Sequence, residues 1–111
     1  MAYDEELARR IRELVAAEIG VTEQRMFGGL AFLVNGNMAV AASGEGGVLL
    51  RVDPKSSAGF VDEPGVRPMV MRGREMQGWL RIDGTRVRTK RDLERWVGRG
   101  IKYATSLPPK G

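Results

Sequence analysis

The sequence predicts an α+β fold, a two-layer sandwich in which helices pack on a mainly antiparallel sheet. Near both ends of the chain, apolar residues recur at the three- and four-residue spacing of amphipathic helices. Between them lie short apolar runs separated by Gly, Pro, Asn and Asp, a pattern typical of strands and turns. The expected order is helix, three strands, helix, two strands, helix.

The first helix is expected from about Asp4 to Glu18, with Leu7, Ile11 and Ile19 on its apolar stripe and a terminating glycine at position 20. Three strands should follow, over residues 26–34, 37–42 and 48–52. The strongest short hairpin signal, Asn-Gly, joins the first two at positions 35 and 36. Because these strands are apolar on both faces, we expect them to be central strands that are covered on both sides or packed in a dimer.

The second half begins with a short helix that starts at Asp53-Pro54 and runs to about Phe60. Two further strands are predicted over residues 66–71 and 78–82. The last helix should run from Lys90 to about residue 105, with Thr89 as its N-cap, and Gly98 and Gly100 should weaken or bend it.

Length and composition indicate one domain that spans residues 1–111. No apolar run approaches the roughly 18–20 residues needed to cross a bilayer. The N-terminus is acidic, unlike the basic start of a secretory signal. We therefore expect a cytoplasmic protein.

The chain has no cysteine and no histidine. Zinc sites, Ser-His-Asp triads and Cys-His dyads therefore cannot be built. The carboxylates are scattered along the sequence, so no ligand set for a metal can be named. We expect a protein that is not an enzyme and needs no cofactor.

Charge is distributed unevenly along the sequence. Residues 1–65 contain six basic and ten acidic residues, a net charge of −4, whereas residues 66–111 contain twelve basic and four acidic residues, a net charge of +8. Arginine binds phosphate at two points, so a cluster of arginines on one face would hold nucleic acid without reading its sequence. The candidate nucleic-acid-binding residues are Arg72, Arg74, Arg81, Arg86, Arg88, Lys90, Arg91 and Arg95. The alternative is that they are solvated surface charges.

A second group of candidates could contact a ligand or a protein partner. It comprises Met26, Phe27, Gly28, Gly29 and Trp79. The glycines would let a ligand approach the backbone closely, and Trp79 could stack on a base beside the arginines. The alternative is that the methionine and aromatic side chains fill the core and the glycines form a bulge. A magnesium or small-molecule role around Gly28-Gly29 is a further hypothesis without a ligand set.

Methionines at positions 69, 71 and 76 suggest an adaptable protein-binding surface or a dimer seam, although methionine alternating on a strand usually fills a core. We expect protein partners or self-association, with nucleic acid as the alternative partner.

Three stretches of the chain together resemble the TfoX/Sxy N-terminal domain family of bacterial proteins. They are Arg25-Met26-Phe27-Gly28-Gly29-Leu30-Ala31-Phe32 with Asn35-Gly36-Asn37-Met38, then Met71-Arg72-Gly73-Arg74-Glu75-Met76 with Gly78-Trp79, and Leu93-Glu94-Arg95-Trp96-Val97 with Ala104 and Leu107-Pro108-Pro109-Lys110. The resemblance implies the same two-layer order of elements. Named members are regulators of competence gene expression, and the longer ones continue into a C-terminal helical domain. Because this chain ends at Gly111, the resemblance implies a stand-alone regulatory module, and no catalytic motif can be carried over from the family.

Overall fold

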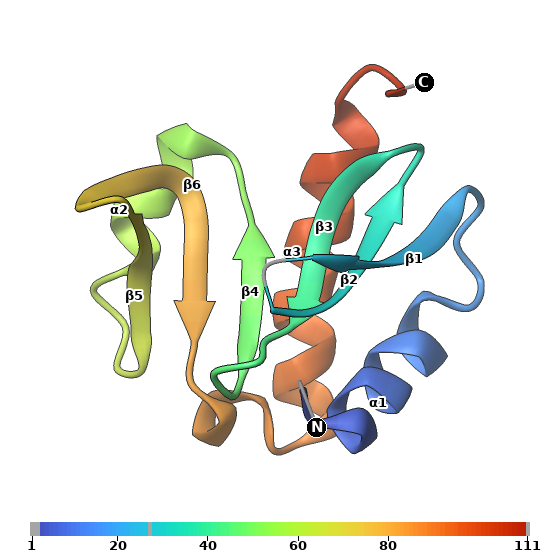
Figure 1. The fold of residues 1–111 in the computed structure, drawn as a ribbon, viewed down its shortest axis with the longest axis horizontal. Coiled ribbons are helices and arrows are strands. Elements are labelled where there is room, and N and C mark those ends of the chain that lie inside the picture. Colours follow the sequence, from blue (N-terminus) through green and yellow to red (C-terminus); the bar gives the residue numbers. More distant parts are fainter. Residues whose placement is uncertain (1–2, 27, 111) are drawn as a thin grey trace.

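The computed structural model describes residues 3–26 and 28–110, and its sheet has six strands, all joined in antiparallel pairs (Figure 1). The strands follow the order β1-β2-β3-β4-β6-β5 across the sheet. They are β1 (Val21–Met26), β2 (Gly29–Val34), β3 (Asn37–Ala42), β4 (Val48–Arg51), β5 (Val66–Met71) and β6 (Arg74–Ile82). The predicted α+β class and antiparallel sheet are confirmed.

Four strands, rather than the predicted three, precede the second helix. The strand that was missed, β1, reads Val-Thr-Glu-Gln-Arg-Met and lies at the edge of the sheet, mostly exposed. Its edge position removes the need for the apolar alternation by which a strand is recognised. The run expected as one strand over residues 26–34 is divided, because Met26 ends β1 and Gly29 begins β2.

Two of the hairpin turns have the same backbone conformation. Asn35 and Gly36 join β2 to β3 with φ angles of 51° and 85°, and Arg72 and Gly73 join β5 to β6 with φ angles of 55° and 78°. Two successive positive φ angles are typical of the type I′ turn, whose twist matches that of the flanking strands. The first turn confirms the Asn-Gly prediction. The second extends β6 back to Arg74, four residues earlier than expected.

The first helix, α1 (Glu5–Val15), begins at Asp4, whose side chain accepts hydrogen bonds from the backbone N–H groups of Glu6 and Leu7 at 3.0 and 3.1 Å. It ends three residues before the predicted Glu18, because the chain turns there toward β1. Ile19, expected on the apolar stripe, lies beyond the helix and is 92% exposed.

The remaining helices are α2 (Pro54–Phe60), the short 3₁₀ helix η1 (Gly84–Val87), which was not predicted, and α3 (Lys90–Ser106). Thr89 caps α3 as predicted, since its hydroxyl accepts from the N–H of Asp92 at 3.1 Å. α3 continues through Gly98 and Gly100 without interruption. None of the described helices has the length and apolar content needed to span a membrane.

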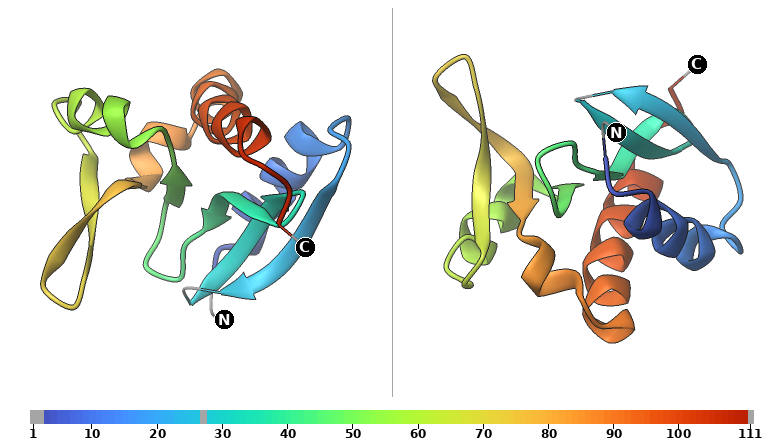
Figure 2. Two further views of the ribbon diagram at one scale, coloured as in Figure 1. Left: turned by 90° about the horizontal axis from the view of Figure 1, so that it is seen from above. Right: turned by 60° about the horizontal axis from the view of Figure 1, so that its bottom comes forward.

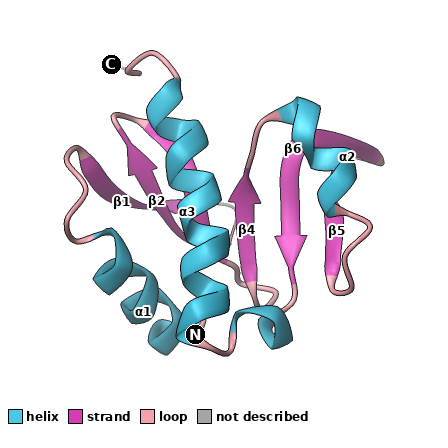
Figure 3. Ribbon diagram, turned by 180° about the vertical axis from the view of Figure 1, so that it is seen from behind, coloured by secondary structure: helices cyan, strands magenta, loops and turns pink. Residues whose placement is uncertain are grey.

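All three α-helices cover the same face of the sheet (Figure 3). α3 packs across β3 and β4, α1 lies beside it, and α2 packs on β6 and β5. The main core fills the space between these layers and centres on the fully buried Trp96, Phe32 and Ile11. No helix formed by the described residues lies on the opposite face of the sheet, which we call the helix-free face (Figure 2 and Figure 3).

Candidate partner-binding face

A second apolar cluster lies on the helix-free face. Its buried members come from β2, β3, β4 and β5: Ala31, Leu33, Met38, Ala41, Leu49 and Met69. Three partly buried side chains pack over them: Met26, Met76 and Trp79. Methionine and tryptophan side chains thus cover this cluster.

The curvature of the sheet brings these side chains together. The β1–β2 and β5–β6 hairpins both project away from α3, so that the sheet is arched with its helix-free face on the inside (Figure 2). A register shift between Phe32 and Leu33 interrupts the pairing of β2 with β3, and one between Pro68 and Met69 interrupts the pairing of β5 with β6. Such bulges bend a strand and increase its twist. The bulges thus help to place Met26 of one arm and Met76 of the other over a common centre.

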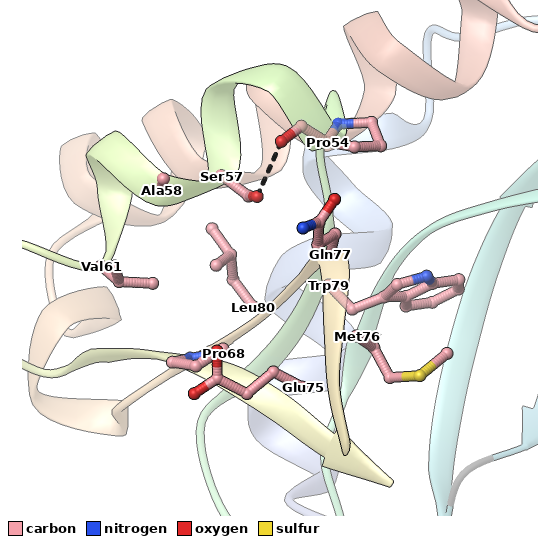
Figure 4. Close-up of a pocket in the computed structure, with 10 residues that line it drawn as sticks. All are labelled: Pro54, Ser57, Ala58, Val61, Pro68, Glu75, Met76, Gln77, Trp79 and Leu80. Carbon is pink, nitrogen blue, oxygen red and sulfur yellow. Dashed lines mark hydrogen bonds between the residues drawn. The ribbon is translucent and has the colours of Figure 1, made fainter.

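Strict alternation along β6 would put Met76 and Leu80 on the same face, but the register shift that takes the pairing from Pro68–Leu80 to Met69–Met76 breaks it. Leu80 points toward the helices and is part of the main core, whereas Met76 and Trp79 belong to the second cluster. Figure 4 shows the groove between α2 and the β5–β6 hairpin, where Met76 and Trp79 point away from Ala58 of α2 and from Val61, which follows it.

Arginines of β4 and β6 border the apolar centre of the helix-free face. Arg51 pairs in register with Trp79, and its guanidinium carbon lies 5.2 Å from the centroid of the Trp79 ring. Arg81 donates to the carboxylate of Glu45 at 2.9 Å and to the hydroxyl of Ser43 at 3.1 Å. Arg74 pairs in register with Met71 and is exposed. We call Arg51, Arg74 and Arg81 the basic rim.

The predicted nucleic-acid-binding residues are not gathered on one surface. Arg72 and Arg74 lie at the tip of the β5–β6 hairpin and Arg81 lies near the other end of β6. The remaining five follow β6, on η1 and at the start of α3: Arg86, Arg88, Lys90, Arg91 and Arg95. Since β6 has nine residues, roughly 20–25 Å separate its two ends.

Several of these arginines are already paired with carboxylates. Besides the Arg81–Glu45 pair, Arg86 bonds Glu63 at 3.0 Å and Arg95 lies 3.7 Å from Asp92. Arg86 also donates to the carbonyl oxygen of Pro64. Arg86 therefore holds the loop before β5, which is a structural role that sequence spacing did not reveal.

The second predicted group divides in a different way. Met26 and Trp79 meet on the helix-free face, as members of one cluster. Gly29 is buried, and a Cβ atom there would lie 2.0 Å from the carbonyl oxygen of Ala42, so this position needs glycine for close packing of β2 on β3. Gly28 has a φ of 72° and open space around it. Phe27 lies outside the described residues.

Displaced pKa values occur elsewhere in the molecule. The hydrogen bond from Arg12 lowers the pKa of Glu23, and the hydrogen bond from Arg9 lowers the pKa of Glu6. These carboxylates lie on α1 and β1, on the helix side of the sheet. Within residues 3–26 and 28–110, no three acidic side chains come together as a metal site would require.

Comparison with known protein families identifies the domain. Residues 13–104 match the model of the TfoX N-terminal domain. No curated protein and no solved structure gives a significant match. The matched segment runs from the last turn of α1 to the last turn of α3, and the helix–strands–helix–strands–helix order agrees with the order that the resemblance implies. The chain therefore belongs to the TfoX N-terminal domain family.

Proposed function

We propose that this domain is a non-enzymatic regulatory module that acts through protein contacts. Its helix-free face would receive a partner segment with an apolar stripe flanked by acidic residues, such as an amphipathic helix. The observation that carries the proposal is the combination, on one arched face, of a methionine–tryptophan centre and a basic rim. The regulatory part of the proposal rests on the resemblance to competence regulators.

The apolar centre supports protein binding because its outer side chains are the kinds that bind partners. Methionine is flexible and polarizable, so it adapts to different apolar surfaces. Tryptophan is enriched among the residues that dominate interface energetics. Met26, Met76 and Trp79 together cover the second cluster but stay partly exposed, so a partner could bury them further.

The basic rim supports an acidic partner rather than a second copy of the chain. Among the described residues, neither Arg51 nor Arg74 has a carboxylate within ion-pair distance, and Glu45 pairs only with Arg81. A symmetric dimer through this face would place the same patch against itself, arginines included. Like charges brought together in this way disfavour the contact, whereas carboxylates of a partner would stabilise it.

The turn between β5 and β6 gives a further reason. Arg72 has a φ of 55°, a left-handed conformation that Asn or Gly adopts at lower cost. A residue that breaks a local preference often has a functional reason. Arg72 adds a positive charge at the tip of the hairpin that bears Arg74 and Met76.

The test uses two synthetic helical peptides with the same Leu and Met stripe, one flanked by Glu and one by Lys. Each is titrated into protein labelled at the methionine methyl groups, and NMR follows Met26, Met69 and Met76. We expect the Glu peptide to shift these signals and to bind about tenfold more tightly than the Lys peptide at low salt, a preference that salt reduces. Equal binding of the two peptides, or shifts confined to other parts of the protein, would contradict the proposal.

Two charge reversals of equal size sharpen this test. Arg74→Glu removes a cation from the basic rim, and Arg91→Glu removes an exposed cation from the first turn of α3. Only Arg74→Glu should lower the affinity of the protein for the Glu peptide. The alternative is that a second copy of the chain occupies the helix-free face. Analytical ultracentrifugation of the protein alone tests it, because a dimer that Met76→Glu breaks would assign the face to self-association.

Direct binding of nucleic acid is the second candidate function. Its support is the segment from Arg88 to Arg91, where Arg88, Lys90 and Arg91 are all exposed and, among the described residues, have no carboxylate within ion-pair distance. Fluorescence anisotropy of labelled duplex DNA and single-stranded RNA over a salt series tests it. Affinity that falls steeply with salt, and that falls further in Arg88→Ala and Arg91→Ala, would support phosphate binding; no binding at low salt would end this candidacy.

A further inference from the structure

A cavity of about 410 Å³ lies on the helix side of the sheet, between α2 and the last turns of α3. Figure 3 shows both helices on this face, on either side of the end of β4. Half of the lining comes from β4–α2 and half from α3: Val52, Asp53, Ser56, Phe60, Arg99, Lys102, Tyr103 and Ser106. The volume is within the range of roughly 300–1,000 Å³ that small-molecule sites occupy.

Helical spacing directs these side chains to one place. Residues 99, 102, 103 and 106 are three, four and seven positions apart, so they share one face of α3. Residues 53, 56 and 60 are spaced similarly along α2. The cavity wall therefore combines two cations, three hydroxyl groups and two aromatic rings.

Arg99 is held in place by packing rather than by a carboxylate. Its guanidinium carbon lies 4.7 Å from the ring centroid of Phe60 and 4.5 Å from that of Trp96. Its Nη1 is buried without a hydrogen-bond partner, as is Nε1 of Trp96 beneath it. A buried donor without an acceptor is destabilising, so this arginine is preorganised but incompletely satisfied.

Charge in the cavity favours an anion. In the described part of the chain, no carboxylate lies within ion-pair distance of Arg99 or Lys102. The acid in the lining is Asp53, and one of its oxygens accepts the backbone N–H of Lys55 at 2.9 Å, as the N-cap of α2. Arg51 adds positive charge nearby, with its guanidinium carbon 5.6 Å from the ring centroid of Tyr103.

The geometry points to a binding site for a small organic anion, in which Arg99 and Lys102 hold a carboxylate or phosphate group and Phe60 and Tyr103 contact an apolar, planar body. Hydroxyl groups of Ser56 and Tyr103 are placed to donate to the same anionic group or to a polar substituent. The residues that line this cavity are not those of the second cluster or the basic rim, so the site can exist whether or not a protein binds to the helix-free face.

Three probes test the site: phenyl phosphate, inorganic phosphate and benzyl alcohol. Binding is followed by backbone amide NMR and by tryptophan fluorescence in Trp79→Phe, which leaves Trp96, packed against Arg99, as the reporter. Phenyl phosphate should shift residues of α2 and the second half of α3. It should bind about tenfold more tightly than inorganic phosphate, because the ring adds apolar contact, and benzyl alcohol should not bind measurably. Substituting benzoate for phenyl phosphate separates carboxylate from phosphate preference.

Variants on α3 decide whether the cavity is responsible. Arg99→Gln and Lys102→Gln should each lower the affinity for phenyl phosphate about tenfold, because each removes one charge-assisted contact. Lys102 is exposed and outside the core, so its variant remains informative if Arg99→Gln destabilises the fold. Arg95→Gln, on the same helix but outside the cavity lining, should bind as the unsubstituted protein does. No shift with any probe, shifts elsewhere, or unchanged affinity in both glutamine variants would overturn the assignment.

Discussion

Replacement of Gly98 and Gly100 by alanine, one at a time, should change the stability of the domain in opposite directions. Both glycines lie within α3, two residues apart, where alanine favours the helix by about 1 kcal/mol over glycine. Around Gly98, no heavy atom beyond its neighbours lies within 4 Å of the position that a Cβ would take. Gly98→Ala should therefore raise the free energy of unfolding by nearly the full propensity difference.

At Gly100, by contrast, there is no space for an added Cβ atom. Its Cβ would lie 2.6 Å from the carbonyl oxygen of Ala39 and 2.7 Å from Cδ1 of Leu50. The leucine can rotate, but the oxygen belongs to the backbone of β3, so α3 must move away from the sheet. Overpacking of this kind costs about 3 kcal/mol at the upper end of its usual range, which leaves a net loss of about 2 kcal/mol after the helix gain.

Urea denaturation followed by tryptophan fluorescence measures both changes. In a domain of this size the Tm shifts by about 4 °C for each kcal/mol. The Tm should therefore rise by about 4 °C in Gly98→Ala and fall by about 8 °C in Gly100→Ala. Similar denaturant slopes would show that the unfolded states are comparable. The reasoning fails if Gly100→Ala is as stable as the parent protein, because α3 would then not pack on β3 as closely as described.

Two further predictions concern the sheet and its pairing with α1. Arg72→Asn should raise the free energy of unfolding by about 0.5–1 kcal/mol in urea denaturation, because asparagine adopts the positive φ at lower cost; a loss of stability would mean that Arg72 makes a stabilising contact. Glu23→Gln should destabilise the protein by about 0.5 kcal/mol at neutral pH, as expected for an exposed pair with Arg12. Since the folded pKa of Glu23 is lowered from 4.5, the contribution of the carboxylate is present above that value and disappears as pH falls through the folded pKa. Parent and variant should therefore have the same stability in acid, and a difference that persists there would assign the effect to packing.

Much of the fold could be predicted from the sequence because local signals and long-range packing agree. The helix at each end has a polar cap and an apolar stripe, and both form with the predicted caps or starts. Asn35-Gly36 specifies its hairpin through a backbone conformation that few other residue pairs adopt. The edge strand β1 could not be predicted in this way, because its position at the side of the sheet relieves it of an apolar pattern.

The candidate sites were only partly predictable, because they depend on where the strands lie. Met26 and Trp79 were candidates individually, but their meeting depends on β4 lying between β3 and β6 and on the two bulges that bend the hairpins. Charge by sequence halves was also a poor guide to surfaces. α2 from the acidic half packs on β6 and β5, while α3 from the basic half packs on β3 and β4, so the halves interleave.

Arg51 determines how the two candidate sites can be separated by experiment. Its guanidinium lies near the Trp79 ring on the helix-free face and near the Tyr103 ring that lines the cavity. A change at Arg51 would disturb both places, so its effect on peptide or anion binding could not be assigned to either. Arg74 borders only the partner-binding face and Lys102 only the cavity. If the two sites are independent, the effects of Arg74→Glu and Lys102→Gln on binding free energy should be additive. If the double variant instead departs from additivity in binding free energy, and that departure vanishes when Arg51 is replaced, Arg51 links the anion site to the partner-binding face.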